Sequence, residues 1–209
     1  MSFVIEYFSK AKRVITSPTE LFEDEKQRNA FGYPIKFATF SLVLVGLLSA
    51  AELIFAGPPS QFSFDPPVLA GVLVVGTPII GVLILLIDAA LIHIFVALLG
   101  GQNGYSQTLG AISYAIPVAV LGPAASLVAS IVGTIGTTGS FIGSILGVLA
   151  GLVQVIYGLY VQTRGISEFQ DLSLGESFGA IVLSLIIIAV FVFALSILAT
   201  AILFAQVPV

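Results

Sequence analysis

The sequence predicts an all-α, polytopic membrane protein, in which a bundle of five transmembrane helices follows an N-terminal amphipathic helix in the membrane interface. Two observations predict this class. The chain of 209 residues is 58% hydrophobic and only 9% charged, a composition typical of polytopic membrane proteins. No lysine or arginine occurs between Lys36 and Arg164, as expected where lipid makes an unpaired charge costly.

Composition and missing motifs exclude several function classes. The net charge of −4 argues against nucleic-acid binding, which needs a basic face. The chain has no cysteine and a single histidine, which excludes disulfides, thiol catalysis and cysteine- or histidine-rich metal sites. There is no phosphate loop, His-Glu-x-x-His sequence or Gly-x-Ser-x-Gly elbow. We therefore expect no enzyme, no catalytic residues, no metal and no cofactor.

Residues 1–32 form the first expected region, a cytoplasmic segment that contains an amphipathic helix over 3–16. Apolar residues recur there at helical spacing, and Glu6, Lys10 and Arg13 fall largely elsewhere. Aromatic residues on one side and basic residues on the other suit a helix in the interface. The apolar set is Phe3, Tyr7, Phe8, Ala11, Val14 and Ile15. A short polar helix is expected after Ser17 and Pro18.

Residues 33–209 form the second expected region, a five-helix transmembrane domain. Each apolar run exceeds or approaches the roughly 20 residues that cross a hydrocarbon core. Arg164 is expected to end the fourth span, and Ser173 and Glu176 have the form of a capping box before the fifth. The expected spans cover about 35–56, 68–99, 108–135, 141–161 and 178–204.

Prolines are expected to break two of these spans. A straight helix over 68–99 would measure roughly 48 Å, which exceeds the hydrocarbon core of about 30 Å. Either it kinks near Pro78, or it runs straight into the headgroups and carries His93 there. Pro117 and Pro123 should bend the third span or split it into two pieces.

The basic residues give an orientation. Six of the seven lie before the first span or at its very start, and Arg164 lies between the fourth and fifth. Five crossings put all of them on one side of the membrane, which is the cytoplasmic side by the positive-inside rule. We therefore expect a multi-pass protein of the plasma membrane with a cytoplasmic N-terminus and an external C-terminus.

Four polar residues within the spans are candidates for an intramembrane site: Asp88, His93, Glu52 and Gln154. Asp88 and His93 are separated by about 140° of helical rotation, so they do not form a ready-made metal pair. They serve either as a proton or ion site or as groups wetted at the cytoplasmic interface. Glu52 either caps an outer vestibule, pairs with a neighbouring helix or snorkels. Gln154 is expected to hydrogen bond between helices.

Glycines recur at every fourth residue in the fourth span, at Gly139, Gly143, Gly147 and Gly151. This spacing places a groove along one helix face, and small residues let helices approach closely in lipid. The groove serves either contact within the chain, which we favour, or a dimer interface.

The order of several short motifs resembles the Yip1 domain family. Ser17-Pro18 followed by Phe22 resembles an element before the first span of prokaryotic members, and His93 with Gly100-Gly101 resembles the end of the second span. Further similar segments are Thr108 to Tyr114 with Pro117, Gly158 to Gly165, and Leu172 to Gly179. The resemblance implies five membrane helices and a cytoplasmic N-terminus. Eukaryotic relatives act in vesicle traffic and engage prenylated Rab GTPases, but their Asp-Leu-Tyr-Gly-Pro element is missing here.

Two functions follow as expectations. We favour a non-enzymatic protein of the Yip1 type that organises the lipid bilayer or its partners, where the partner is another membrane protein or a second copy of the chain. The alternative is an ion or small-solute transporter or channel that uses Asp88, His93 and Glu52, because discontinuous helices often frame a site at mid-membrane.

Overall fold

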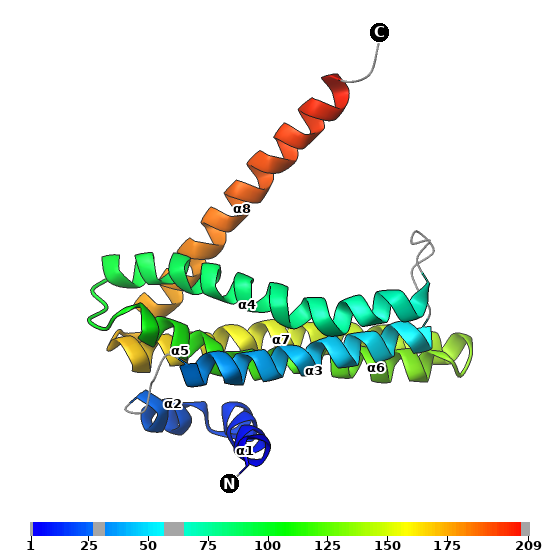
Figure 1. Ribbon diagram of the computed structural model, residues 1–209, viewed down its shortest axis with the longest axis horizontal. Helices are drawn as coiled ribbons and strands as arrows, with labels where there is room; N and C mark the ends of the chain where they lie inside the picture. Colours follow the sequence, from blue (N-terminus) through cyan, green and yellow to red (C-terminus); the bar gives the residue numbers. More distant parts are fainter. Residues whose placement is uncertain (1, 27–31, 57–64, 206–209) are drawn as a thin grey trace.

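The computed structural model describes residues 2–26, 32–56 and 65–205, and all regular structure in these ranges is helical (Figure 1). Five stretches are long and apolar enough to cross a membrane: Gly32–Ala56, Pro66–Leu98, Tyr105–Gly133, Thr137–Gln170 and Leu174–Leu198. The predicted class, an all-helical protein with five membrane spans, is confirmed. The elements are α1 Phe3–Thr16, α2 Pro18–Lys26, α3 Gly32–Ala56, α4 Pro66–Leu98, α5 Tyr105–Ala115, the 3₁₀ helix η1 Ile116–Val120, α6 Leu121–Gly133, α7 Thr137–Gln170 and α8 Leu174–Ala205.

The bundle has two different ends (Figure 1). At the near end, on the left of the figure, lie α1, α2 and the connection from α4 to α5. At the far end lie the last turn of α3 and the turn between α6 and α7. Helix α8 starts at the near end and leans away from the other helices, so that only its first turns pack against α4 and α7.

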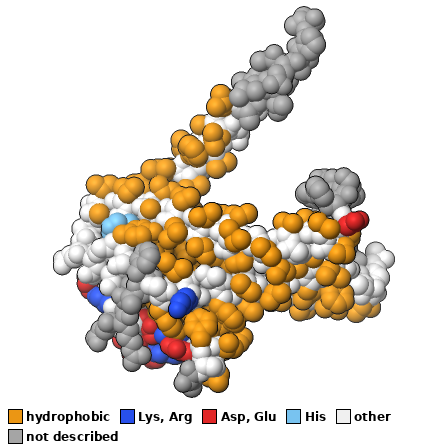
Figure 2. Space-filling view, viewed as in Figure 1, with side chains coloured by type: hydrophobic (Ala, Val, Ile, Leu, Met, Phe, Trp, Pro, Cys, Tyr) orange, Lys and Arg blue, Asp and Glu red, His pale blue; other side chains and the backbone are white. Residues whose placement is uncertain are grey.

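The buried core is concentrated at the near end. It combines α1 and α2 with the adjoining turns of α3, α4, α5, α7 and α8, and includes Tyr7, Phe22, Phe37, Ile92, Leu109, Tyr114, Ile166, Phe169 and Ile181. The rest of the bundle presents apolar side chains outward along its length (Figure 2), whereas charged side chains in that view gather mainly over α1 and α2. Outward-facing apolar surface of this extent is expected where lipid is the solvent.

Helix α7 is longer than the sequence predicts. The fourth span was expected to end at Arg164, but the helix continues to Gln170. No residue from 144 to 160 is buried, whereas Ile166 and Phe169 are fully buried. The Phe22 ring of α2 packs edge-on against Phe169, with 5.9 Å between ring centroids. The helix continues past Arg164 because its last turns gain these protein contacts, which a single arginine does not interrupt.

Prolines and caps shape the other spans. Helix α4 continues through Pro78 without interruption. Pro117 lies in η1, which joins α5 to α6, and Pro123 lies in the first turn of α6, where a missing N–H does little harm. At the start of α8, the Glu176 carboxylate accepts hydrogen bonds from the Ser173 N–H at 2.9 Å and hydroxyl at 2.7 Å. The predicted capping box is therefore present.

Candidate functional site

A buried ion pair holds α1 to the rest of the protein. The Lys10 ammonium lies 2.9 Å from the Glu25 carboxylate of α2 and 3.0 Å from that of Glu6. The Tyr114 hydroxyl of α5 donates a 2.6 Å hydrogen bond to the other Glu25 oxygen. The ammonium also lies 4.2 Å from the centre of the Tyr33 ring. Glu25 is only 3% exposed, so its charge depends on these partners.

Lys10 was expected outside the apolar face of α1, and that expectation is wrong. Tyr7, Lys10 and Val14 are all buried, as their spacing of three and four residues allows. Burial alone lowers the pKa of Lys10, but the carboxylates of Glu25 and Glu6 outweigh it and raise the pKa above its ordinary value. The hydrogen bond from Lys10 in turn lowers the pKa of Glu6.

Two further contacts fix α1 in place. The Tyr7 hydroxyl lies 2.9 Å from the Ser41 hydroxyl of α3. The Tyr157 hydroxyl of α7 donates to the backbone oxygen of Ile15 at 2.7 Å. These contacts join α1 to two spans that are far apart in the sequence.

The outer surface of α1 is divided into two faces. Val4, Phe8 and Ile15 form an apolar face and are 46%, 55% and 42% exposed. Ser9 and Lys12 lie on a neighbouring exposed face, which is largely polar but also carries Ile5, 55% exposed. Since Tyr7 and Val14 form the buried face, α1 offers separate surfaces to protein, to apolar surroundings and to water.

A polar network surrounds His93 at the near end. The Gln170 amide donates to the Thr108 hydroxyl oxygen at 2.9 Å, and His93 Nδ1 lies 2.9 Å from the same oxygen. Because that oxygen already accepts from Gln170, its own proton is available to His93 Nδ1, which fits a neutral imidazole. The Asn103 backbone N–H donates to the Gln170 side chain at 3.1 Å. The network thus holds the connection between α4 and α5 against the end of α7.

A second ion pair ties α2 to the end of α7. The Lys26 ammonium lies 2.5 Å from the Asp171 carboxylate, which also accepts a 3.1 Å hydrogen bond from the Asn103 amide. The hydrogen bond from Lys26 lowers the pKa of Asp171 below its ordinary value. Asp171 has a left-handed backbone with φ of 56° and ends α7.

Asp88 lies in a groove between α4 and α8. The groove has a volume of about 470 Å³ and is otherwise lined by apolar side chains, among them Ile84, Ile87, Ile187 and Phe191. Asp88 is half-buried. It does not share a hydrogen-bond network with His93 in the described part of the chain.

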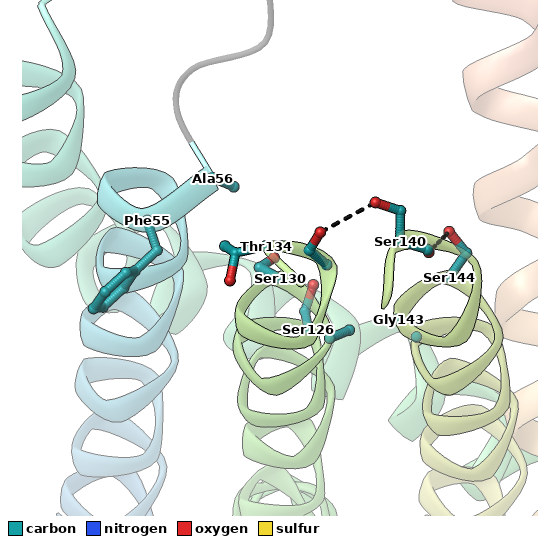
Figure 3. Close-up of a pocket in the computed structure, with 11 residues that line it drawn as sticks. Phe55, Ala56, Ser126, Ser130, Thr134, Ser140, Gly143 and Ser144 are labelled. Carbon is teal, nitrogen blue, oxygen red and sulfur yellow. Dashed lines mark hydrogen bonds between the residues drawn. The ribbon is translucent and has the colours of Figure 1, made fainter. Parts of the chain in front are cut away.

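Glu52 lies at the far end, where it joins α3 to α6. Its carboxylate accepts hydrogen bonds from the Ser126 hydroxyl at 2.5 Å and the Ser130 hydroxyl at 3.4 Å. Both serines line a pocket of about 510 Å³ between the ends of α3, α6 and α7. Figure 3 shows that the hydroxyl groups of Thr134 and Ser140 also line this pocket. Glu52 is therefore paired with a neighbouring helix.

Gln154 and the glycines of α7 contribute to packing in different ways. A β-carbon at Gly139 or Gly143 would overlap the backbone of α6, so α6 and α7 approach closely there. A β-carbon at Gly147 or Gly151 would meet nothing within 4 Å. The Gln154 side chain contacts Gly122 of α6.

The polar residues singled out in the spans do not converge. Asp88 and His93 lie toward the near end in different surroundings, whereas Glu52 lies at the far end and Gln154 between α6 and α7. Within the described ranges, no three histidine, aspartate or glutamate side chains form a group suited to a metal ion. The densest polar cluster instead belongs to α1, α2 and the near end of the bundle.

Glu25 and Tyr114 are central to that cluster. The sequence analysis missed Glu25 and named Tyr114 only as the end of a short motif. Glu25 follows Leu21 by four residues and Phe22 by three, so helical spacing places it on the buried face of α2, unlike the other acidic residues of that helix. A second, weaker signal existed, because Lys10 follows Glu6 at a spacing of four and shares a face with Tyr7.

This chain matches one known family of proteins. The family model described as Yip1 domain matches residues 12–197. No curated protein matches the chain. No solved structure matches it either.

Proposed function

The chain belongs to the Yip1 domain family, and from this premise we propose that it is a non-enzymatic membrane protein that organises the bilayer or its membrane protein partners through α1. The supporting observation is the division of α1 into a docked face, an apolar outer face and a polar outer face. A helix with these surfaces fits the boundary between lipid and water.

The docked face gives α1 a fixed depth and rotation. Lys10 is held by Glu25, and Tyr7 lies against Ser41 of a membrane span. Ile15 and about half of the Phe8 side chain are thereby left exposed at the level of the near end, while the Phe8 ring also packs edge-on against Phe40 of α3. Apolar side chains held there insert among lipid headgroups or against a partner in the same membrane.

The near end is the cytoplasmic end in this proposal. Among the described residues, the lysines and arginines lie in α1, in α2, in the first turns of α3 and in the final third of α7. Such clustering at one end follows the positive-inside rule. The C-terminus of α8 then lies outside the cytoplasm of a cell whose plasma membrane holds the protein.

The test changes the apolar outer face of α1. Phe8→Ser with Ile15→Ser removes two exposed apolar side chains and leaves the buried ion pair in place, although it also removes the ring contacts of Phe8 with Tyr7 and Phe40. In proteoliposomes of fixed lipid composition, imaged by electron cryomicroscopy, the unmodified chain should change vesicle diameter and the double variant should not. In membranes, crosslinking yield to partners should fall with the same variant.

A matched control makes the same chemical change elsewhere. Phe193→Ser with Ile197→Ser alters two exposed side chains of α8, 68% and 56% exposed. This control should remodel vesicles as the unmodified chain does. If the α1 variant retains full remodelling and full partner crosslinking, the proposal is wrong.

A further inference from the structure

We propose that the pocket beside Glu52 is a binding site for a primary ammonium group. The pocket opens at the far end, between α3, α6 and α7 (Figure 3). Its polar side chains are all hydroxyls: Ser126, Ser130, Thr134, Ser140 and Ser144. The inference rests on the acceptors to which these hydroxyl groups donate their protons, and on the negative charge of Glu52 behind the pocket wall.

Each hydroxyl proton already has an acceptor within the protein. Ser126 and Ser130 donate to Glu52. Thr134 donates to the Ile131 backbone oxygen at 2.7 Å.

The two serines of α7 are committed in the same way. The Ser140 hydroxyl donates to the backbone oxygen of Gly133 at 3.1 Å, and the Ser144 hydroxyl donates to the backbone oxygen of Ser140 at 2.9 Å. A hydroxyl that has committed its proton still has lone pairs to offer. The lining side chains therefore present acceptors to the pocket, and the complementary ligand carries donors.

The charge at this end also favours a cation. Glu52 lies one hydrogen bond behind the pocket wall, through Ser126. Its positive partner cannot be a lysine or arginine of a neighbouring span, because the sequence has none between Lys36 and Arg164 and none after Arg164. An anionic ligand, such as a phosphate group, would meet lone pairs and a carboxylate without any compensating positive group.

A primary ammonium group combines both requirements, since it has three N–H donors, one positive charge and no acceptor. The pocket of about 510 Å³ exceeds the volume of a bare metal ion and admits an organic group. Two sources share this chemistry: the headgroup of phosphatidylethanolamine, which lies at the depth of a span's end, and a free amine in solution.

The first arm of the test compares two lipids that carry the same charge. The full chain is titrated with phosphatidylethanolamine or phosphatidylcholine, and the bound lipid is counted by native mass spectrometry. The trimethylated nitrogen of phosphatidylcholine has no N–H donor. We expect about tenfold tighter binding of phosphatidylethanolamine, and we expect Glu52→Gln to abolish the difference.

Matched variants separate the pocket from the rest of the far end. Asp65→Asn removes an exposed carboxylate of the same end and should leave the preference intact. Gly147 lines the pocket and has open space at its β-carbon position, whereas Gly151 has open space but does not line it. Gly147→Leu should abolish the preference without disturbing the fold, and Gly151→Leu should not.

The second arm adds free ethanolamine or tetramethylammonium to the chain in phosphatidylcholine nanodiscs and follows thermal unfolding. Stabilisation by ethanolamine alone, lost in Glu52→Gln and Gly147→Leu, supports the site with a soluble amine as its source. A lipid preference in the first arm supports the headgroup as its source. Absence of discrimination in both arms, or discrimination that survives both pocket variants, would overturn the proposal.

Discussion

The Tyr114 hydroxyl donates a 2.6 Å hydrogen bond to the buried carboxylate of Glu25, which lies 89 residues earlier in the sequence. The same carboxylate binds the Lys10 ammonium at 2.9 Å. One side chain of α2 therefore joins α1 to a membrane span. The position of α1 depends on this carboxylate, because a buried charge without a partner is costly.

Replacement of Lys10 should destabilise the protein through the charge that it leaves behind. Lys10→Met preserves the aliphatic stem but deprives Glu25 of its cation, so we expect a loss of about 3 kcal/mol in the free energy of unfolding. Lys12→Met alters an exposed residue of the same helix and should change it by less than about 0.5 kcal/mol. Denaturant unfolding in detergent measures both, and equal effects of the two would contradict the role of the buried pair.

The contact between α2 and α7 should weaken in acid. The ion pair between Lys26 of α2 and Asp171 at the end of α7 lowers the pKa of Asp171 below its ordinary value of 3.8. A lowered pKa means that this pair stabilises the fold above pH about 4 and that its contribution is lost as the pH falls through the folded-state pKa. The chain has no cysteine of its own. Spin labels at Glu23→Cys in α2 and at Gly175→Cys, four residues beyond Asp171, therefore report the distance between α2 and the chain that directly follows α7.

That distance should widen in acid in the otherwise unmodified chain. With Asp171→Asn, we expect the wider distribution already at neutral pH and little change on acidification. A distance that responds to acid equally in both proteins would show that another group controls the contact.

The hydroxyl of Thr108 should matter more than its methyl group. Thr108→Val leaves both the Gln170 amide and His93 Nδ1 without their shared partner, with an expected cost of about 1–3 kcal/mol. Thr108→Ser retains the hydroxyl and should cost about 1 kcal/mol for the lost methyl group. Thermal unfolding of the two variants side by side decides the point, and a serine variant less stable than the valine variant would argue against the network.

The glycines of α7 should differ sharply in their tolerance of a methyl group. Gly143→Ala places a β-carbon against the Ala129 backbone oxygen and forces α6 and α7 apart, with an expected cost of about 1–3 kcal/mol. Gly151→Ala places it in open space and should be neutral, or stabilising by up to about 1 kcal/mol through helix propensity. Thermal unfolding measures both, and equal stability of the two variants would contradict close packing at Gly143.

The spans could be predicted from the sequence because the requirement of the bilayer is local. Any stretch of about 20 predominantly apolar residues satisfies it, whatever its neighbours are. The end of α7 could not be predicted in this way. Arg164 breaks the apolar run, but the helix continues because Phe22 of α2 covers Gly165 and Phe169. That cover is a tertiary contact, which hydropathy does not register.

The polar contacts divide in the same manner. The capping box of Ser173 and Glu176 involves residues three apart, and its sequence pattern was sufficient. The pairing of Glu52 with Ser126 crosses 74 residues, and that of Glu25 with Tyr114 crosses 89. Serine and tyrosine occur widely in membrane helices, so their identity alone does not reveal which of them meets a carboxylate.

The near-end core also has a consequence for how the protein is made. Helices α1 and α2 are synthesised first, yet Val14 accepts a hydrogen bond from Tyr157, 143 residues later, and Lys26 pairs with Asp171, 145 residues later. At about 5–20 residues per second, a ribosome needs on the order of ten seconds to deliver those partners. Throughout that interval the first two helices have no completed docking surface, so α1 and α2 dock late although they are synthesised first.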